Sequence, residues 1–292
     1  MLALLLSAFL ELQSVRDDPC VDLPTSRNFL DQDPSPPPAE KGFFEEMGNT
    51  IWSVGKTFVL DMGYLLATPL RPTRDGFLTF AGGVGVIAVT MAVLDEPIRG
   101  FAQRNRHENL DQTLGIIRDA MSRPVETGIG LAALGLLVED PHLTRTGLEI
   151  VETDFVTGLL TSVGKRVFGR SRPNTGRGAH SFKFFGGTEE GRRSFPSGAA
   201  QEAFAIAVPV AEEYPETMWP YVVYGLASLA SIQRVVADGH WTSDILTSAL
   251  LSVAVGKALV WLHQQEVHPP LVPWLAEVDP HRALGVALQL GF

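Results

Sequence analysis

The sequence has little of several features that would mark other classes of protein. Its 292 residues include one cysteine, Cys20, which excludes an internal disulfide framework and a cysteine-rich metal cluster. Basic residues are in the minority, 23 against 33 acidic residues, so the formal net charge is −10. Nucleic-acid-binding proteins need a basic surface, and we therefore expect no nucleic-acid partner. Strand patterns are sparse, and we predict an all-α fold.

Long hydrophobic runs are few. The mean hydropathy of +0.12 is low for a chain made almost wholly of membrane helices. Residues 77–94 form an uncharged run of 18 residues, close to the length that crosses a bilayer. Because an exposed run of this kind would aggregate, we expect it either to cross a membrane or to lie fully buried in a bundle. The other uncharged runs, 128–138, 217–233 and 245–256, fit buried helices or helices that cross within a bundle.

Composition divides the chain into four parts. Residues 1–14 begin with a short apolar run that is typical of a signal peptide or an N-terminal anchor, although no basic residue precedes it. Residues 15–42 form a polar, proline-rich linker. A helical domain is expected over 43–270, with its motif core at 75–264, and a tail over 271–292. Alternating apolar residues from 284 to 292 favour one extended segment there.

Helical periodicity and Pro or Gly junctions predict a bundle of about six core helices, either soluble or embedded in a membrane. An amphipathic helix is expected over about 43–66, followed by helices at about 75–94, 111–119, 124–138, 143–168, 198–212, 217–236 and 242–264.

Three polar clusters interrupt this apolar, helical pattern. The first runs from Lys165 to Arg172, in a basic district of an otherwise acidic chain. The second is the Ser-Phe-Pro-Ser-Gly segment that ends at Ser197 and Gly198. The third comprises Arg234, His240 and Asp244. Arginine and lysine neutralise phosphoryl oxygens, a Ser-Gly turn offers a hydroxyl and backbone amides, and a histidine oriented by a carboxylate can attack phosphorus.

Each cluster taken alone also has a structural interpretation. Lys165 and Arg172 are seven residues apart, so a continuing helix would place both on one face, which is usually a solvated one. Ser197 precedes an apolar segment and could cap a helix as well as bind an anion at its N-terminus. His240 and Asp244 are one helical turn apart, which lets the carboxylate hold one imidazole nitrogen.

In order and spacing, from about residue 75 to 264, the three clusters resemble the signature of the type 2 phosphatidic acid phosphatase superfamily, which also includes bacterial acid phosphatases and vanadium haloperoxidases. The resemblance implies roles for individual residues. Lys165, Arg172 and Arg234 correspond to the phosphate-binding cations, with Ser197 and Gly198 as further phosphate ligands. His240 corresponds to the nucleophile and Asp244 to its partner.

The chain departs from the signature at two positions. Gln233 replaces the serine that precedes the arginine, and Ala199 replaces the first histidine, which in this family looks like the general acid for the leaving oxygen. A positioned general acid contributes roughly 10²–10⁴ in rate, so we expect impaired turnover with phosphate binding retained. Ala199 fits either a natural weak or non-catalytic member or a histidine removed deliberately.

The resemblance implies a metal-independent phosphatase that hydrolyses lipid phosphate monoesters or diphosphates through a phosphohistidine, with no cofactor, although vanadate or phosphate could occupy the site. The expected substrate is a phospholipid or an isoprenoid phosphate, in the inner membrane of a bacterial envelope with a periplasm-facing site. Alternatives are a soluble periplasmic acid phosphatase, a vanadate-dependent haloperoxidase and a non-catalytic phospholipid-binding protein. The oligomeric state stays open.

Overall fold

The computed structural model describes Lys56, Leu60, Asp61, Gly63 and residues 74–264. Within these residues the regular elements are helices, joined by loops that contain one isolated bridge between Arg170 and Phe182. The predicted all-α fold is therefore confirmed. The expected signal peptide or anchor, the linker, the terminal extended segment and most of the 43–66 helix lie outside the described residues.

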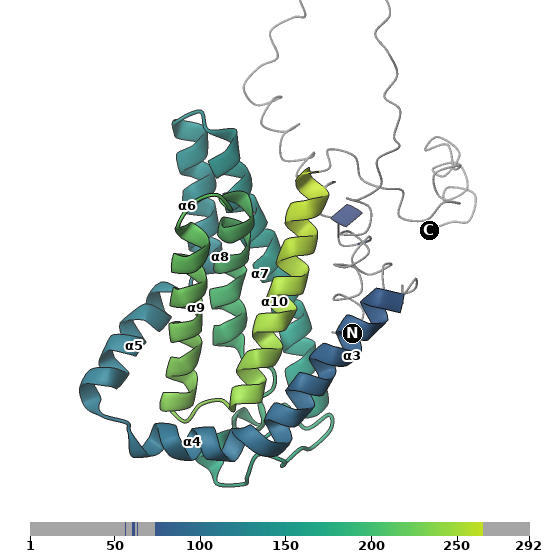
Figure 1. Cartoon of the computed structure of the whole chain (residues 1–292), viewed down its shortest axis with the longest axis vertical. Helices are drawn as coiled ribbons and strands as arrows, with labels where there is room; N and C mark the ends of the chain where they lie inside the picture. The colour runs from purple at the N-terminus through teal and green to yellow at the C-terminus, as the bar shows by residue number, and fades with distance from the viewer. Residues whose placement is uncertain (1–55, 57–59, 62, 64–73, 265–292) are drawn as a thin grey trace, which may run out of the picture.

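Nine helices and two short 3-10 turns follow one another in the described residues (Figure 1). They are α3 (Arg74–Val89), the π-helical η3 (Thr90–Leu94), α4 (Asp95–Arg104), α5 (Glu108–Ala120), α6 (Pro124–Leu137), α7 (Pro141–Phe168), η4 (Pro173–Thr175), η5 (Glu190–Arg192), α8 (Gly198–Glu213), α9 (Trp219–Val236) and α10 (Thr242–Gln264).

Local signals explain where these helices begin and end. Pro124 and Pro141 stand in the first turns of α6 and α7, where a missing amide costs nothing. The Asp140 side chain caps α7 by accepting from the amides of His142 and Leu143. The predicted helix at 75–94 is longer than expected, because η3 runs directly into α4.

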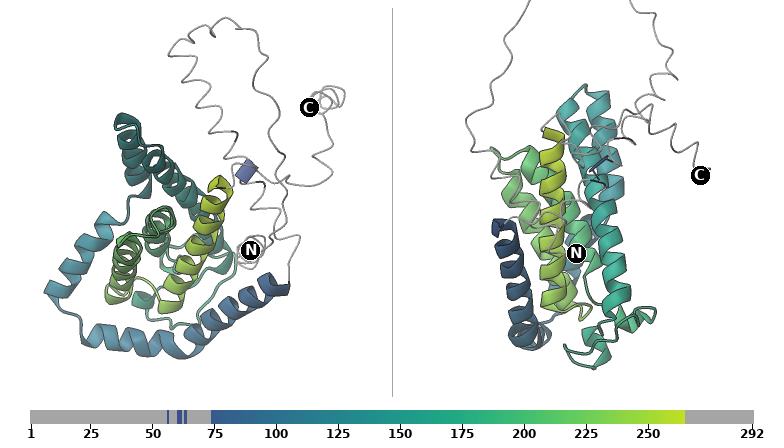
Figure 2. Two further views of the ribbon diagram at one scale, coloured as in Figure 1. Left: turned by 45° about the horizontal axis from the view of Figure 1, so that its top comes forward. Right: turned by 90° about the vertical axis from the view of Figure 1, so that its right-hand side faces the viewer.

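Helices α6 to α10 form the bundle, packed side by side along its long axis (Figures 1 and 2). One apolar cluster joins α7 to α10, with Leu160 against Leu251, Val255 and Leu259. A second cluster joins α7, α8 and α9. Its members include Ile150, Ala203, Phe204, Ala207, Val223 and Ala227. Close packing of α6 against α7 depends on Gly147, where a Cβ would lie 2.4 Å from the Ala132 amide nitrogen.

Helices α3, α4 and α5 wrap around this bundle as an arc (Figure 2, left). Most of α3 stands out from the core, with Val86 and Val89 more than half exposed. Within the continuous helical stretch Gly76–Arg104, only 11% of the most apolar 18-residue segment is buried. The alternative that residues 77–94 are buried in the bundle is therefore wrong. The crossing of a membrane stays a prediction for them.

The outer surface of the bundle is also apolar. Two helical stretches, Gly76–Arg104 and Thr242–Gln264, are long and apolar enough to cross a bilayer, and the second is mostly buried. Exposed large apolar side chains continue over α5, α6, α7 and α9. They include Ile116, Ile129, Leu136, Leu137, Phe155, Leu159, Leu226, Leu229 and Ile232. A contiguous apolar surface of this extent marks contact with a membrane or another protein.

We expect α3 to anchor the protein in a bilayer. Membranes from expressing cells should retain the chain through an alkaline carbonate wash and release it only with detergent, because the exposed α3 side chains would otherwise meet water. A soluble periplasmic protein in the same preparation serves as the control for complete release. Quantitative release of this chain by carbonate would contradict the prediction.

Candidate functional site

The three polar clusters meet at one end of the bundle. Lys165 lies in the last turn of α7, Arg234 in the last turn of α9, and His240 in the loop that leads into α10. Ser197 is the residue that caps the start of α8. These helix ends come together at the lower end of the bundle in Figure 1. Helix geometry thus gathers residues that are up to 79 positions apart, from 165 to 244.

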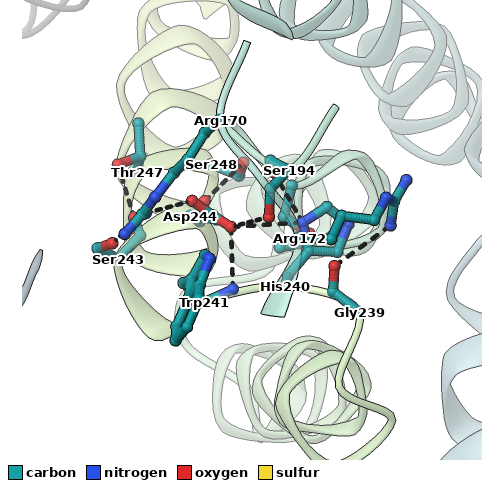
Figure 3. Close-up of polar contacts among 12 residues, drawn as sticks. Arg170, Arg172, Ser194, Gly239, His240, Trp241, Ser243, Asp244, Thr247 and Ser248 are labelled. Carbon is teal, nitrogen blue, oxygen red and sulfur yellow. Dashed lines mark hydrogen bonds and ion pairs between the residues drawn. The ribbon is translucent and has the colours of Figure 1, made fainter. Parts of the chain in front are cut away.

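The Asp244 carboxylate is the centre of the site and is fully buried (Figure 3). One oxygen, Oδ1, accepts from Arg170 Nη1 at 2.6 Å. The other, Oδ2, accepts from the Ser194 hydroxyl at 2.5 Å and from the Trp241 amide at 2.9 Å. A buried carboxylate is tolerated when it is paired and hydrogen-bonded in this way. Asp244 therefore ties together the three chain segments that contribute to the site.

His240 is oriented by a backbone carbonyl. Its Nδ1 lies 2.7 Å from the Ser194 carbonyl oxygen, which can only accept, so Nδ1 carries the proton. The Nε2 lone pair is then free to act as a base or nucleophile.

His240 and Asp244 do not form the direct hydrogen bond that the sequence predicted. His240 Nδ1 and Asp244 Oδ2 are 3.6 Å apart, which is too long for a hydrogen bond. The physical reason is that Asp244 Oδ2 already accepts from Ser194 and Trp241. Asp244 acts on the imidazole through Ser194, whose hydroxyl it binds and whose carbonyl holds the ring.

Burial lowers the pKa of His240 from its ordinary value, and the nearby Asp244 carboxylate opposes this effect. The side chain is 4% exposed. Arg172 and Arg234 add to the lowering, because a positive imidazolium close to two guanidinium groups is disfavoured. His240 is thus held neutral near physiological pH, the state in which its free nitrogen is nucleophilic.

Two arginines lie close to this histidine. Arg172 donates to the Gly239 carbonyl at 3.2 Å and pairs with Glu190 at 2.8 Å. Arg234 packs against Gly239, where a Cβ would lie 2.7 Å from its Nη2. Its Nε is buried and has no hydrogen-bond partner among the described residues. An unpaired buried guanidinium nitrogen beside a neutral histidine is suited to receive an anion.

Lys165 reaches the start of α8. A Cβ at Gly198 would lie 2.9 Å from the Lys165 ammonium nitrogen, so a larger residue at position 198 would displace the cation. The first amides of α8 have no acceptor within the helix, and the helix dipole adds a partial positive charge there. The Ser197 hydroxyl accepts from the Ala200 amide at 3.4 Å, which confirms the capping interpretation.

Lys165 and Arg172 do not share one face of a continuing helix, as their spacing suggested. Helix α7 ends at Phe168 because Gly169 takes a left-handed conformation, with φ of 52°. A Cβ at Gly169 would also lie 2.0 Å from the Lys183 carbonyl oxygen. The chain turns there, and Arg172 reaches the site from an extended segment.

The sequence did not reveal the buried residues that hold Asp244 in place. Arg170 is fully buried and bridges Asp244 to Asp95 at the start of α4, with 2.7 Å from its Nη2 to Asp95 Oδ2. Ser243 donates to the same Asp95 carboxylate through its amide and hydroxyl. In the sequence, Arg170 is only one of several neighbouring basic residues. No local signal indicates that it is buried or that it bridges two carboxylates.

Ala199 lies in the first turn of α8, half-buried, and contributes a methyl group to this face. Glu202 follows one turn later and is half-buried as well. Lys165 and Arg234 are among the charges that act on its carboxyl group. Glu202 is therefore an ionisable group on the side of α8 that faces the cations.

Comparison with known proteins shows what part of this chain is similar to. The sequence model of the PAP2 superfamily matches residues 147–268, a stretch that contains all three clusters. The lipid A 1-phosphatase of Porphyromonas gingivalis is 35% identical over 107 residues, which are 36% of this chain. The match spans about a fifth of that relative, 21% of its length.

Two solved structures are similar at 20% sequence identity. The crystal structure of LpxE from Aquifex aeolicus matches with a TM-score of 0.45, over 56% of this chain and 93% of its own. A transmembrane PAP2-type phosphatidylglycerolphosphate phosphatase from Bacillus subtilis matches with a TM-score of 0.46, over 72% and 96%.

The PAP2 superfamily model matches residues 147–268, and this part of the chain, which holds the three motifs, is similar to that superfamily. The resemblance that the motifs carried is thereby confirmed.

We expect Arg170 to be essential for stability. Arg170→Met should lower the free energy of unfolding by about 3–5 kcal/mol, because it leaves the buried carboxylates of Asp95 and Asp244 without their shared cation. Chemical denaturation in detergent measures this change. Arg166→Met, at an exposed position on α7, is the matched control. Equal stability of the two variants would show that the buried ion pair makes no net contribution to the free energy of unfolding.

Proposed function

We propose that this chain is a phosphatase that hydrolyses lipid phosphate monoesters or diphosphates through a phosphohistidine, with no metal in the reaction. The observation that carries the proposal is the state of His240: Nδ1 donates to the Ser194 carbonyl, and Nε2 is free beside the cations. Lys165, Arg172 and Arg234 are positioned to neutralise the phosphoryl oxygens.

The reaction would run in two steps. Nε2 of His240 attacks phosphorus, a P–N bond forms, and the P–O bond to the leaving group breaks with its electron pair on oxygen. Positive charge on the imidazole is stabilised by the Ser194 carbonyl and by Asp244 behind it. Water then attacks phosphorus, and the P–N bond breaks with its electron pair on Nε2, which restores the neutral histidine. One water proton stays on the released phosphate, and the other passes to solvent, which supplies the proton that the leaving oxygen takes up.

An apolar cavity beside the site supports a lipid substrate. Its volume is about 300 Å³, within the range of small-molecule pockets. Its walls come from α3, α7, α10 and the Phe195-Pro196 segment. The lining residues are Phe80, Val84, Ile87, Leu160, Gly164, Phe168, Phe195, Pro196, Thr247 and Leu251. Gly164 and Pro196 directly precede Lys165 and Ser197, so an acyl or isoprenoid chain in the cavity would present its phosphate to the cations.

The apolar outer surface and the name of the Porphyromonas gingivalis relative also support this substrate class. We infer a site in the bacterial inner membrane that faces the periplasm, because a phosphate group stays in water while its chain enters the cavity. A soluble periplasmic acid phosphatase would have no use for the exposed α3 or for the cavity that α3 closes.

Ala199 favours a second candidate function. The methyl group cannot protonate a leaving oxygen, while the cations and His240 are retained, so the chain could bind phospholipid phosphate without turnover. A vanadate-dependent haloperoxidase fits less well, because that chemistry also relies on the missing histidine. Glu202, one turn further along α8, is the ionisable group on this face that could donate a proton instead.

The leaving group distinguishes these possibilities. Without an acid at position 199 the leaving oxygen departs with its negative charge, so residual turnover should favour aryl phosphates and diphosphates over alkyl phosphates. Ala199→His should raise hydrolysis of a lipid monophosphate by about 10²-fold or more and change aryl phosphate hydrolysis much less. Steady-state rates of both variants on both substrates provide the measurement.

Two companion variants complete this experiment. His240→Asn should abolish turnover of every substrate. Glu202→Gln should depress the alkyl rate selectively if its carboxyl supplies the proton. An Ala199→His variant that changes neither rate would show that position 199 is not the acid position. Phosphate binding without turnover in all variants would instead support the non-catalytic function.

The cavity gives a separate test of the lipid substrate. Val84→Trp, at a residue 41% exposed on α3, should lower kcat/KM for a long-chain lipid phosphate by about tenfold or more, because the indole fills the cavity. The rate on a short-chain phosphate should not change. Val86→Trp, two residues on and outside the lining, is the matched control. Equal effects on both chain lengths would disprove a chain-binding role.

A further inference from the structure

A second polar cluster is buried near the opposite end of the bundle. It comprises His263 in the last turn of α10, Glu149 and Glu152 on one face of α7, and Asp61 from the segment before α3. His263 is 19 residues after Asp244, about 28 Å at 1.5 Å per residue, so the cluster is remote from the phosphate site. In Figure 1 the short coloured piece before α3 lies beside this end of α10.

His263 contacts three carboxylates with its two ring nitrogens. Its Nδ1 lies 3.1 Å from Glu149 Oε1. Its Nε2 lies 3.0 Å from Asp61 Oδ2 and 3.3 Å from Glu152 Oε2. A ring nitrogen carries at most one proton, so Nε2 cannot make a full hydrogen bond to both carboxylates.

The cluster also brings three buried carboxylates together. Asp61 and Glu149 are fully buried and Glu152 is 8% exposed, so three carboxylates share one imidazole. Among the described residues, Glu149 Oε2 and Glu152 Oε1 are buried without a hydrogen-bond partner. A buried carboxylate oxygen without a partner is costly, and a divalent cation bound by Glu152 would give its carboxylate one.

The distances suit one shared ion. Ligand atoms of Asp61, Glu152 and His263 all lie within 4.8 Å of one another. Two ligands bound to one Zn²⁺ at about 2.1 Å are themselves about 3–3.5 Å apart, which matches the separations from Nε2 to the two carboxylates. Glu149 would then accept the Nδ1 proton, the usual way in which a carboxylate fixes the tautomer of a metal-bound histidine.

We propose that Asp61, Glu152 and His263 Nε2 bind one divalent first-row metal ion, Zn²⁺ or Mn²⁺, and that Glu149 orients the imidazole. Mixed carboxylate and imidazole ligands favour metals of this class. The ion joins the segment before α3 to α7 and α10, and so stabilises the end of the bundle remote from the phosphate chemistry. This site is independent of the proposed phosphatase function, since it shares no residue with it.

Metal content of the full-length protein tests the site directly. The chain is purified in detergent, stripped with a chelator, incubated with Mn²⁺ or Zn²⁺, freed of unbound ion and analysed by elemental mass spectrometry. The parent protein should retain about one ion per chain and gain roughly 5 °C or more in Tm at a hundredfold excess over Kd. Glu152→Gln and His263→Gln should retain none and show no gain.

Glu212→Gln is the matched control, because Glu212 pairs with Lys257 in the same bundle and lies outside the cluster. It should retain the ion. Metal retained by all variants, or no metal in the parent protein, overturns the proposal. If the cluster variants fail to fold, the parent protein is titrated with Co²⁺ instead, and its visible absorption tests the site. A visible absorption band that saturates at one equivalent and is displaced by Zn²⁺ supports the site, and its absence rejects it.

Discussion

The buried ion pair between Arg170 and Asp244 is the interaction on which the rest of the site depends. Arg170 is fully buried, and two carboxylates, Asp244 and Asp95, share its guanidinium group. Removal of two carboxylates from water is costly. The arrangement is tolerated because Ser194, Trp241 and Ser243 also donate hydrogen bonds to the two carboxylates. The pair connects α4, the loop after α7 and the start of α10, which are distant in sequence.

The same ion pair indirectly orients His240, the proposed nucleophile. Asp244 holds the Ser194 hydroxyl, and the Ser194 carbonyl holds His240 Nδ1, so the carboxylate fixes the ring without touching it. A distance of 3.6 Å still lets the negative charge oppose the lowering of the His240 pKa by burial. The same geometry leaves Nε2 free, because the carbonyl accepts the only imidazole proton.

The polar interior and the apolar exterior of the bundle are consistent with one another in a bilayer. Exposed α3 side chains and the apolar faces of α6 and α9 would be costly in water and cost little in lipid. Polar groups then need partners inside the protein, and the ion networks at the two ends of the bundle provide them. In the proposed function, a lipid chain would reach the phosphate site through the cavity between α3 and the bundle.

The helices and the three motifs could be predicted from the sequence, because periodicity, caps and short spacings are local properties of the chain. Only the tertiary structure decided that Arg170 is the buried partner of Asp244, that Ser194 stands between Asp244 and His240, and that α3 lies outside the core. His263 and Asp61 are 202 residues apart and meet only when the bundle forms. Long-range ion pairing depends on which helix faces meet, and no local pattern encodes that choice.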